Sequence, residues 1–336
     1  MSVFVETDHP RGQAGNAGSF RDKPNSAPEA WLAPEPPTAA FLDEIAKRLP
    51  GDKWAGDPDT LACIALSVLV EPGDDAVGAS LRTFGPLAAL ERAAGRGKIT
   101  GRDNADAVVA AIAEARLHGI GLLRHGGNGW PSQFAGLGNR APYVLWTKGD
   151  VELLGGPEGM TSVTGSRAAT GYGEHVTMEM ASSLSEAGQT VVTGASYGID
   201  GMAVRSVLNT RGNTVAVLAG GLDRYYPSGH QALIERVERG GLLVSEMAPG
   251  TPPTRSHLEA RWRIIAALSE RTVIVEAGMR SGSLEVASEA RALGRDVCAV
   301  PGPVTSPVST GTNWMIANGT ARLVTDAQDV MGGPRA

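Results

Sequence analysis

Residues 272–284 read TVIVEAGMRSGSL, a β-branched run followed by a glycine-broken turn. The run predicts a buried strand, and Gly278 and Gly282 allow the backbone after it to curve closely around a ligand. The N–H groups of residues 281–283 would open the next helix without partners, and Arg280 adds a planar cation beside them. The stretch therefore predicts a strand, a phosphate-holding turn and a helix. An ordinary turn with a solvated arginine is the alternative.

Similar units recur through the second half of the chain, where short β-branched runs alternate with helical patterns. The predicted strands are 161–164, 190–193, 214–218, 242–245, 272–275, 297–300 and 322–324. This alternation predicts an α/β fold with a doubly wound, mostly parallel sheet. Ligands of such sheets bind outside the carboxyl ends of the strands, so the turns there are the place to look.

The first half has a different organisation. Residues 1–37 are polar and rich in glycine and proline, which predicts a disordered tail. Residues 38–119 carry apolar side chains at helical spacing, as in Phe41, Ile45 and Leu49, and predict a helical N-terminal domain. The following piece, up to residue 150, predicts a short strand packed on the α/β domain, which is expected to span 120–334.

Net charge, cysteine content and hydropathy limit the kinds of ligand and the cellular compartment that the sequence predicts. The 336-residue chain has a formal net charge of −6, so any polyanion site must be a local patch. Cys63 and Cys298 lie in apolar runs and predict core thiols rather than a disulfide or metal site, and no cofactor is expected. The sequence has no apparent leader or membrane-spanning run, so the expected compartment is the cytoplasm.

Three further turns at the predicted sheet edge offer similar chemistry. Glycines open the turns after the strands 161–164, 190–193 and 214–218, and the third turn adds two tyrosines and Arg224. Four such turns with nearby arginines predict a phosphate-lined groove, which suits a polymer better than a small ligand. For each tyrosine, capping the edge of the core is an equal alternative.

Taken in order, the motifs resemble those of the DNA-processing protein A family (DprA, also called Smf). The resemblance runs from about residue 61 to residue 330. The matching pieces are GSR at 165–167, GID at 198–200, GLDR at 221–224, SE at 245–246, PGTPP at 249–253, RIIA at 263–266, EAG at 276–278, RSGSL at 280–284 and VPG at 300–302.

This resemblance implies an extended Rossmann-like domain preceded by a small helical domain of the SAM or helix-hairpin-helix type. It implies a cytoplasmic protein, without catalytic turnover, that binds and protects single-stranded DNA and helps load the RecA recombinase in recombination and natural transformation. The DNA-binding residues it implies are Gly165, Ser166, Arg167, Ala195, Ser196, Tyr197, Gly198, Arg224, Arg261, Trp262, Arg263, Arg280, Ser281, Gly282 and Ser283. It also implies a homodimer through Asn313, Trp314, Met315, Ile316 and Leu323, where burial in the monomer is the alternative for some of them.

Some positions depart from the family pattern. Tyr197 stands where arginine is common, and Trp262 replaces a polar residue between two arginines. Either ring could stack on a base, and Trp262 could instead bury itself. The alternative function is a nucleotide-binding or nucleoside-monophosphate-cleaving enzyme with Glu285 or Glu289 as its acid, although Arg280 stands where such enzymes have a smaller turn.

Overall fold

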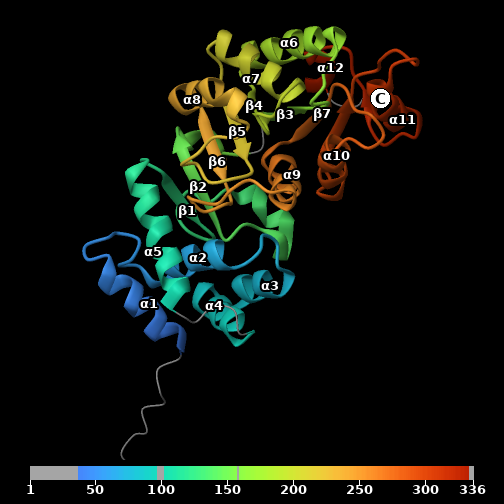
Figure 1. The fold of residues 1–336 in the computed structure, drawn as a ribbon. Coiled ribbons are helices and arrows are strands. Elements are labelled where there is room, and N and C mark those ends of the chain that lie inside the picture. The colour runs from blue at the N-terminus through green and yellow to red at the C-terminus, as the bar shows by residue number, and fades with distance from the viewer. Residues whose placement is uncertain (1–36, 97–101, 157–158, 333–336) are drawn as a thin grey trace, which may run out of the picture. The chain divides into compact units, whose positions relative to one another are not determined.

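The computed structural model describes residues 37–96, 102–156 and 159–332 (Figure 1). The tail predicted for residues 1–37 lies outside the described residues except for Pro37, which begins the first helix.

The described residues form one nine-stranded sheet in the order β1-β2-β6-β5-β4-β3-β7-β8-β9. The strands are β1 (Gly121–Arg124), β2 (Val144–Gly149), β3 (Met160–Thr164), β4 (Thr190–Thr193), β5 (Thr214–Leu218), β6 (Leu242–Ser245), β7 (Arg271–Ile274), β8 (Asp296–Ala299) and β9 (Arg322–Leu323). All seven strands predicted after residue 160 are confirmed to within one residue at each end. They pair in parallel, which confirms the α/β class.

The piece between residues 120 and 150 differs from the prediction. It forms two strands rather than one, and both pair antiparallel: β1 with β2, and β2 with β6. The extra strand leaves little trace in the sequence because Gly121–Arg124 has only four residues and all four are partly exposed.

The sheet changes winding direction between β3 and β7. The chain leaves β3 toward β4, β5 and β6 on one side, and then returns to place β7 against the other side of β3. The turns after β3 and β7 therefore leave the same sheet edge as neighbours and open a crevice there. Such a switch point is where open parallel sheets bind their ligands.

Helices cover both faces of the sheet. One buried cluster joins β3, β4 and β7 to α6 (Gly171–Glu186), α7 (Ile199–Asn209) and α12 (Ala327–Met331). Another joins the opposite face to η1 (Ser132–Arg140), α9 (Arg255–Leu268), α10 (Ser283–Ala292) and α11 (Thr310–Ala317). Figure 1 shows α6, α7 and α12 on one side of the strands and α9 and α10 on the other. The remaining elements of this part are η2 (Val151–Leu154), η3 (Ser228–His230), α8 (Gln231–Gly240) and η4 (Pro307–Ser309).

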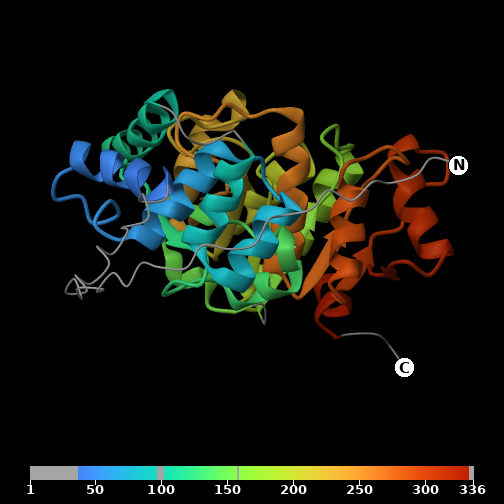
Figure 2. The same ribbon diagram turned by 90° about the horizontal axis from the view of Figure 1, so that it is seen from below.

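In the described part of the chain, five helices precede the sheet, and they lie together in Figure 2. They are α1 (Pro37–Arg48), α2 (Pro58–Leu69), α3 (Asp75–Phe84), α4 (Pro86–Gly95) and α5 (Arg102–Leu117). Gly85, with a φ of 88°, separates α3 from α4, and Phe84 at the end of α3 and Leu87 at the start of α4 are exposed. The helices bury their apolar side chains in a cluster that also contains Tyr143 and Trp146 of the sheet region. The division into two domains at residue 119 stays a prediction.

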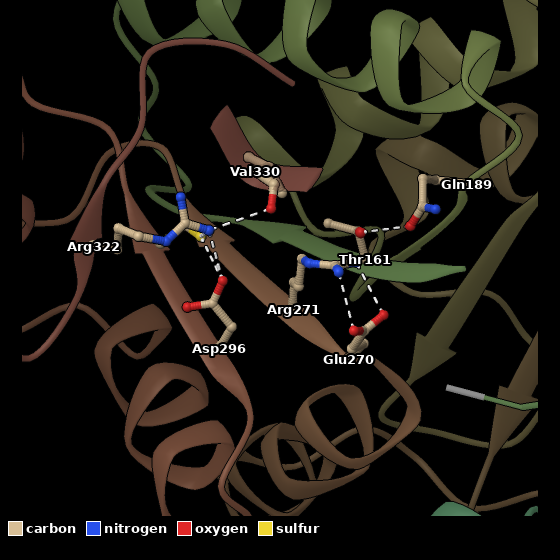
Figure 3. A network of polar contacts seen from close by, with 8 residues as sticks. Thr161, Gln189, Glu270, Arg271, Asp296, Arg322 and Val330 are labelled. Atoms are coloured by element: carbon tan, nitrogen blue, oxygen red, sulfur yellow. Dashed lines mark hydrogen bonds and ion pairs between the residues drawn. The ribbon is translucent and has the colours of Figure 1, made fainter. Parts of the chain in front are cut away.

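At the edge opposite the crevice, one ion pair lies at the start of β7 and another joins the starts of β8 and β9 (Figure 3). Arg271 donates to both carboxylate oxygens of Glu270, at 2.9 and 3.0 Å, and Arg322 donates to Asp296 at 2.7 Å. Arg271 and Arg322 are thus each paired with a carboxylate. In the part of the chain that the structure describes, we find no helix with the length and hydropathy of a membrane span.

Candidate functional site

A groove of about 870 Å³ opens at the switch point between β3 and β7. The turn after β3, the turn after β7 with the start of α10, and one side of α9 form its walls. The lining residues include Thr164, Gly165, Ser166, Arg167, Ser196, Asp200, Leu258, Arg261, Trp262, Met279, Arg280, Ser281, Gly282, Ser283 and Glu285.

The backbone of the turn after β3 is held against the end of β7. The Ser166 N–H donates to the carbonyl oxygen of Glu276 at 2.6 Å. A Cβ on Gly165 would lie 2.7 Å from that same oxygen, so only glycine allows this approach. The Glu276 carboxylate accepts from the Thr170 N–H at 2.9 Å and from its hydroxyl at 2.6 Å, and so orders the entry into α6. The two turns therefore form one braced unit.

The turn after β7 leaves backbone donors facing the groove. The Ser281 N–H donates to the Gly278 carbonyl at 2.9 Å, which differs from the expectation that residues 281–283 are all free. The Ser283 N–H reaches only the Ser281 hydroxyl, at 3.4 Å, and that hydroxyl also bonds Ser283 Oγ at 2.7 Å. Among the described residues, the N–H groups of Arg280 and Gly282 have no partner. The positive end of α10 and these donors suit an anion.

Arg167 and Arg280 supply the accessible positive charge. Both are exposed, both line the groove, and neither forms an ion pair with any residue in the described ranges. Three carboxylates also line the groove: Asp200 accepts from the Thr164 hydroxyl at 2.7 Å, Glu259 pairs with Arg255 at 2.8 Å, and Glu285 is exposed without an ion pair to the described residues. Unlike Arg271 and Arg322 at the opposite edge, Arg167 and Arg280 are left for an outside anion.

Arg261 forms part of the groove floor and is buried. Its guanidinium donates to the carbonyls of Gly194 and Val217, at 2.7 and 3.2 Å, and to the Ser196 hydroxyl at 2.7 Å. Desolvation lowers its pKa to about 10, against the opposing effect of Asp200. Arg261 therefore mainly fixes the turn after β4 and adds charge to the floor.

The turn after β4 contributes through one residue. Of the four predicted members, only Ser196 lines the groove. Ala195 is buried with a φ of 51°, and Gly198, with a φ of 72°, has no room for a Cβ beside the Ser166 carbonyl. Tyr197 is 47% exposed, and its ring meets His230 edge-on at 4.7 Å. Tyr197 thus lies beside the groove rather than in its wall.

Two of the predicted arginines are also not brought into the groove. Arg263 is buried and donates to Glu246 at 2.5 Å, to the Arg140 carbonyl at 2.7 Å and to the Ala260 carbonyl. Its direction on α9 differs from that of Arg261 because residues two apart on a helix face different ways. Arg224 is exposed but does not line the groove. The expectation that Arg263 completes the basic groove does not fit this placement.

The sequence reasoning did not single out Asp200, Met279 or Leu258 as groove residues. Asp200 belongs to the Gly-Ile-Asp motif at 198–200, directly after the turn that follows β4. This place in the sequence indicates that it lies at the sheet edge. Leu258 and Met279 carry no such signal, because an apolar residue in a helix or a turn is ordinary. Within the described ranges, no group of three or more His, Cys, Asp or Glu side chains could hold a metal.

The predicted dimer residues differ in what they expose. Trp314 and Leu323 are 48% and 47% exposed. Met315 is buried, Ile316 is partly buried, and Asn313 bonds both the N–H and the carbonyl of Gly302, at 3.1 and 2.9 Å. Only two of the five therefore offer an apolar surface to a partner, and the dimer stays a prediction.

A protein-family model matches more than half of the chain. Residues 121–333 match the family model of DNA recombination-mediator protein A. Among curated proteins, a DNA processing protein DprA of Mycobacterium tuberculosis is 41% identical over 293 residues, which cover 82% of this chain and 75% of that protein. The DprA protein of Streptococcus pneumoniae is 39% identical over 191 residues, or 57% of this chain and 66% of the relative.

Two solved structures share the fold. The DprA structure from Streptococcus pneumoniae superposes with a TM-score of 0.66 at 28% identity, covering 83% of this chain and 98% of that one. A structure described as showing the single-stranded DNA binding mode of the Helicobacter pylori protein gives a TM-score of 0.58 at 27% identity, covering 63% of this chain and 94% of that one.

Proposed function

We propose, since the chain belongs to the DNA recombination-mediator protein A family, that it binds single-stranded DNA along the groove between β3 and β7. One observation carries the proposal: Arg167 and Arg280 lie on neighbouring turns of one groove, exposed and without carboxylate partners among the described residues. Phosphates of a strand would pair with these guanidinium groups and with the free N–H groups at the start of α10. The Helicobacter pylori relative, described by its single-stranded DNA binding mode, supports the same class of ligand.

A strand held in the groove would also be protected and passed to the RecA recombinase during recombination and DNA uptake, in the cytoplasm. The family name, a recombination mediator, supports this step. A homodimer through the exposed Trp314 and Leu323 would place two grooves in one particle and raise avidity for a long strand.

Strand binding is favoured over nucleotide cleavage by the position of the acids. Glu289 accepts two hydrogen bonds from Arg140, both at 2.8 Å, which hold its pKa below the ordinary value, and it does not line the groove. Glu285 lines the groove, but no hydrogen bond or ion pair with the described residues orients it as a general acid or base.

A titration of labelled oligo(dT) against duplex DNA of equal length, competed with thymidine monophosphate, tests the function. We expect preference for the single strand and weak competition by the monophosphate. Equal competition per phosphate, or release of base from the monophosphate, would instead favour the nucleotide enzyme.

A further inference from the structure

Trp262 projects from α9 into the groove wall between two anchored arginines. Arg261 on one side is bound to Gly194 and Ser196, and Arg263 on the other is bound to Glu246 and Arg140. Consecutive helical residues point about 100° apart, so these two anchors fix the rotation of α9 and with it the direction of the Trp262 side chain. The indole is therefore held by its neighbours in sequence before any ligand arrives.

The indole lies against the start of α10. A Cβ built on Gly282 would come 2.7 Å from Cζ2 and 3.3 Å from Cε2 of Trp262. Gly282 has a φ of −63°, which any residue can adopt, so its backbone conformation does not require glycine there. The Trp262 ring requires glycine at this position, because the ring occupies the space that a side chain of residue 282 would need. The phosphate-binding turn and the indole thus form one closely packed unit.

The indole is also open to the groove. Trp262 is partly buried, lines the groove beside Leu258 and Met279, and its Nε1–H donates no hydrogen bond to the described residues. By contrast, the equivalent N–H of Trp146 is fully buried in the core. The groove therefore places an aromatic ring and apolar side chains, which a base could contact, next to the free Gly282 N–H, which could bind the phosphate of the same nucleotide.

We propose that Trp262 is a base-stacking residue that makes the groove select strands bearing nucleobases over a bare sugar-phosphate chain. This inference rests on the proposed function. The phosphate held at Gly282 and Arg280 places the attached nucleoside over the adjacent indole, where aromatic stacking is tolerant of base identity. The groove arginines alone would not distinguish a base-bearing strand from an abasic one, because they contact only phosphate.

The test compares oligo(dT) with an abasic oligomer of equal length and charge. For the wild type we expect the abasic oligomer to bind about 5- to 100-fold more weakly. Trp262→Leu, which keeps an apolar filler against Gly282, should bind both oligomers with the affinity of the abasic one. Trp262→Phe should keep most of the preference, and Phe84→Leu, at a 75% exposed ring outside the groove, should keep all of it.

A second measurement does not depend on the leucine variant folding. Oligo(dT) should quench a part of the tryptophan fluorescence of the wild type that Trp262→Phe lacks, and the abasic oligomer should not. Unchanged preference in Trp262→Leu, or equal quenching in the wild type and Trp262→Phe, would overturn the role of Trp262 while leaving strand binding intact. Failure of the wild type to bind either oligomer would instead overturn the proposed function.

Discussion

Arg263 and Glu246 form a buried ion pair, with 2.5 Å between Nη2 and Oε1 and side chains only 5% and 4% exposed. A buried charge that loses its partner remains desolvated and uncompensated. Glu246→Gln should therefore lower the free energy of unfolding by about 3–5 kcal/mol, as measured by chemical denaturation. The matched change Glu259→Gln, at the exposed pair with Arg255, should leave stability unchanged within error. Equal stability of both variants would contradict a structural role for the Arg263 charge.

Gly198 joins the turns after β3 and β4. Its φ of 72° disfavours any other residue, and a Cβ there would overlap the Ser166 carbonyl. Gly198→Ala should destabilise the protein by roughly 2–4 kcal/mol, from the left-handed conformation and the overlap together. Gly188, with a φ of 79° and open space around it, provides the control, and Gly188→Ala should cost only about 1 kcal/mol. Thermal unfolding of the two variants checks this, and similar losses would show that the overlap does not matter.

Much of the fold could be predicted because parallel strands buried on both faces leave an unmistakable pattern. Val191, Val215 and Val273 belong to such runs, and each is fully buried. Strand β1 was not predicted because its pairing with β2 depends on an antiparallel return rather than on an apolar run. The spacing of Phe84 and Leu87 would fit a single helix, but the chain turns at Gly85, so that Phe84 belongs to α3 and Leu87 to α4.

The site was predictable where it depends on the backbone and less so where it depends on side-chain direction. The glycine-bearing turns at Gly165 and Gly282 mark sheet edges in the sequence, and the structure brings them to one groove. Whether an arginine on α9 faces that groove or the core depends on the rotation of the helix, which the sequence does not reveal. Arg261 and Arg263 show this, because both are buried but only Arg261 lines the groove.

Cys63 and Cys298 provide a pH-dependent prediction. Burial raises the pKa of each thiol to about 12. Because the folded state holds these protons more tightly than the unfolded state, their contribution to stability is complete below pH 9 and is lost as the pH rises toward 12. At pH 8 the thiolate fraction is about 10⁻⁴, so a thiol-specific disulfide reagent should modify neither cysteine rapidly in the native protein and both after denaturation. Rapid modification of either cysteine in the native protein would contradict burial of its thiol and the raised thiol pKa.

Arg167 and Arg280 are the proposed phosphate contacts of a bound strand. Each phosphate contact on a single strand adds about −0.7 to the slope of log affinity against log salt concentration. Oligonucleotide binding should be measured over a range of salt for the wild type, Arg167→Ala, Arg280→Ala and Arg239→Ala, the last removing an exposed arginine of α8 outside the groove. We expect each groove variant to bind more weakly, for all base sequences alike, with a slope shallower by about 0.7, and Arg239→Ala to match the wild type. Wild-type affinity and slope in both groove variants would contradict the proposal.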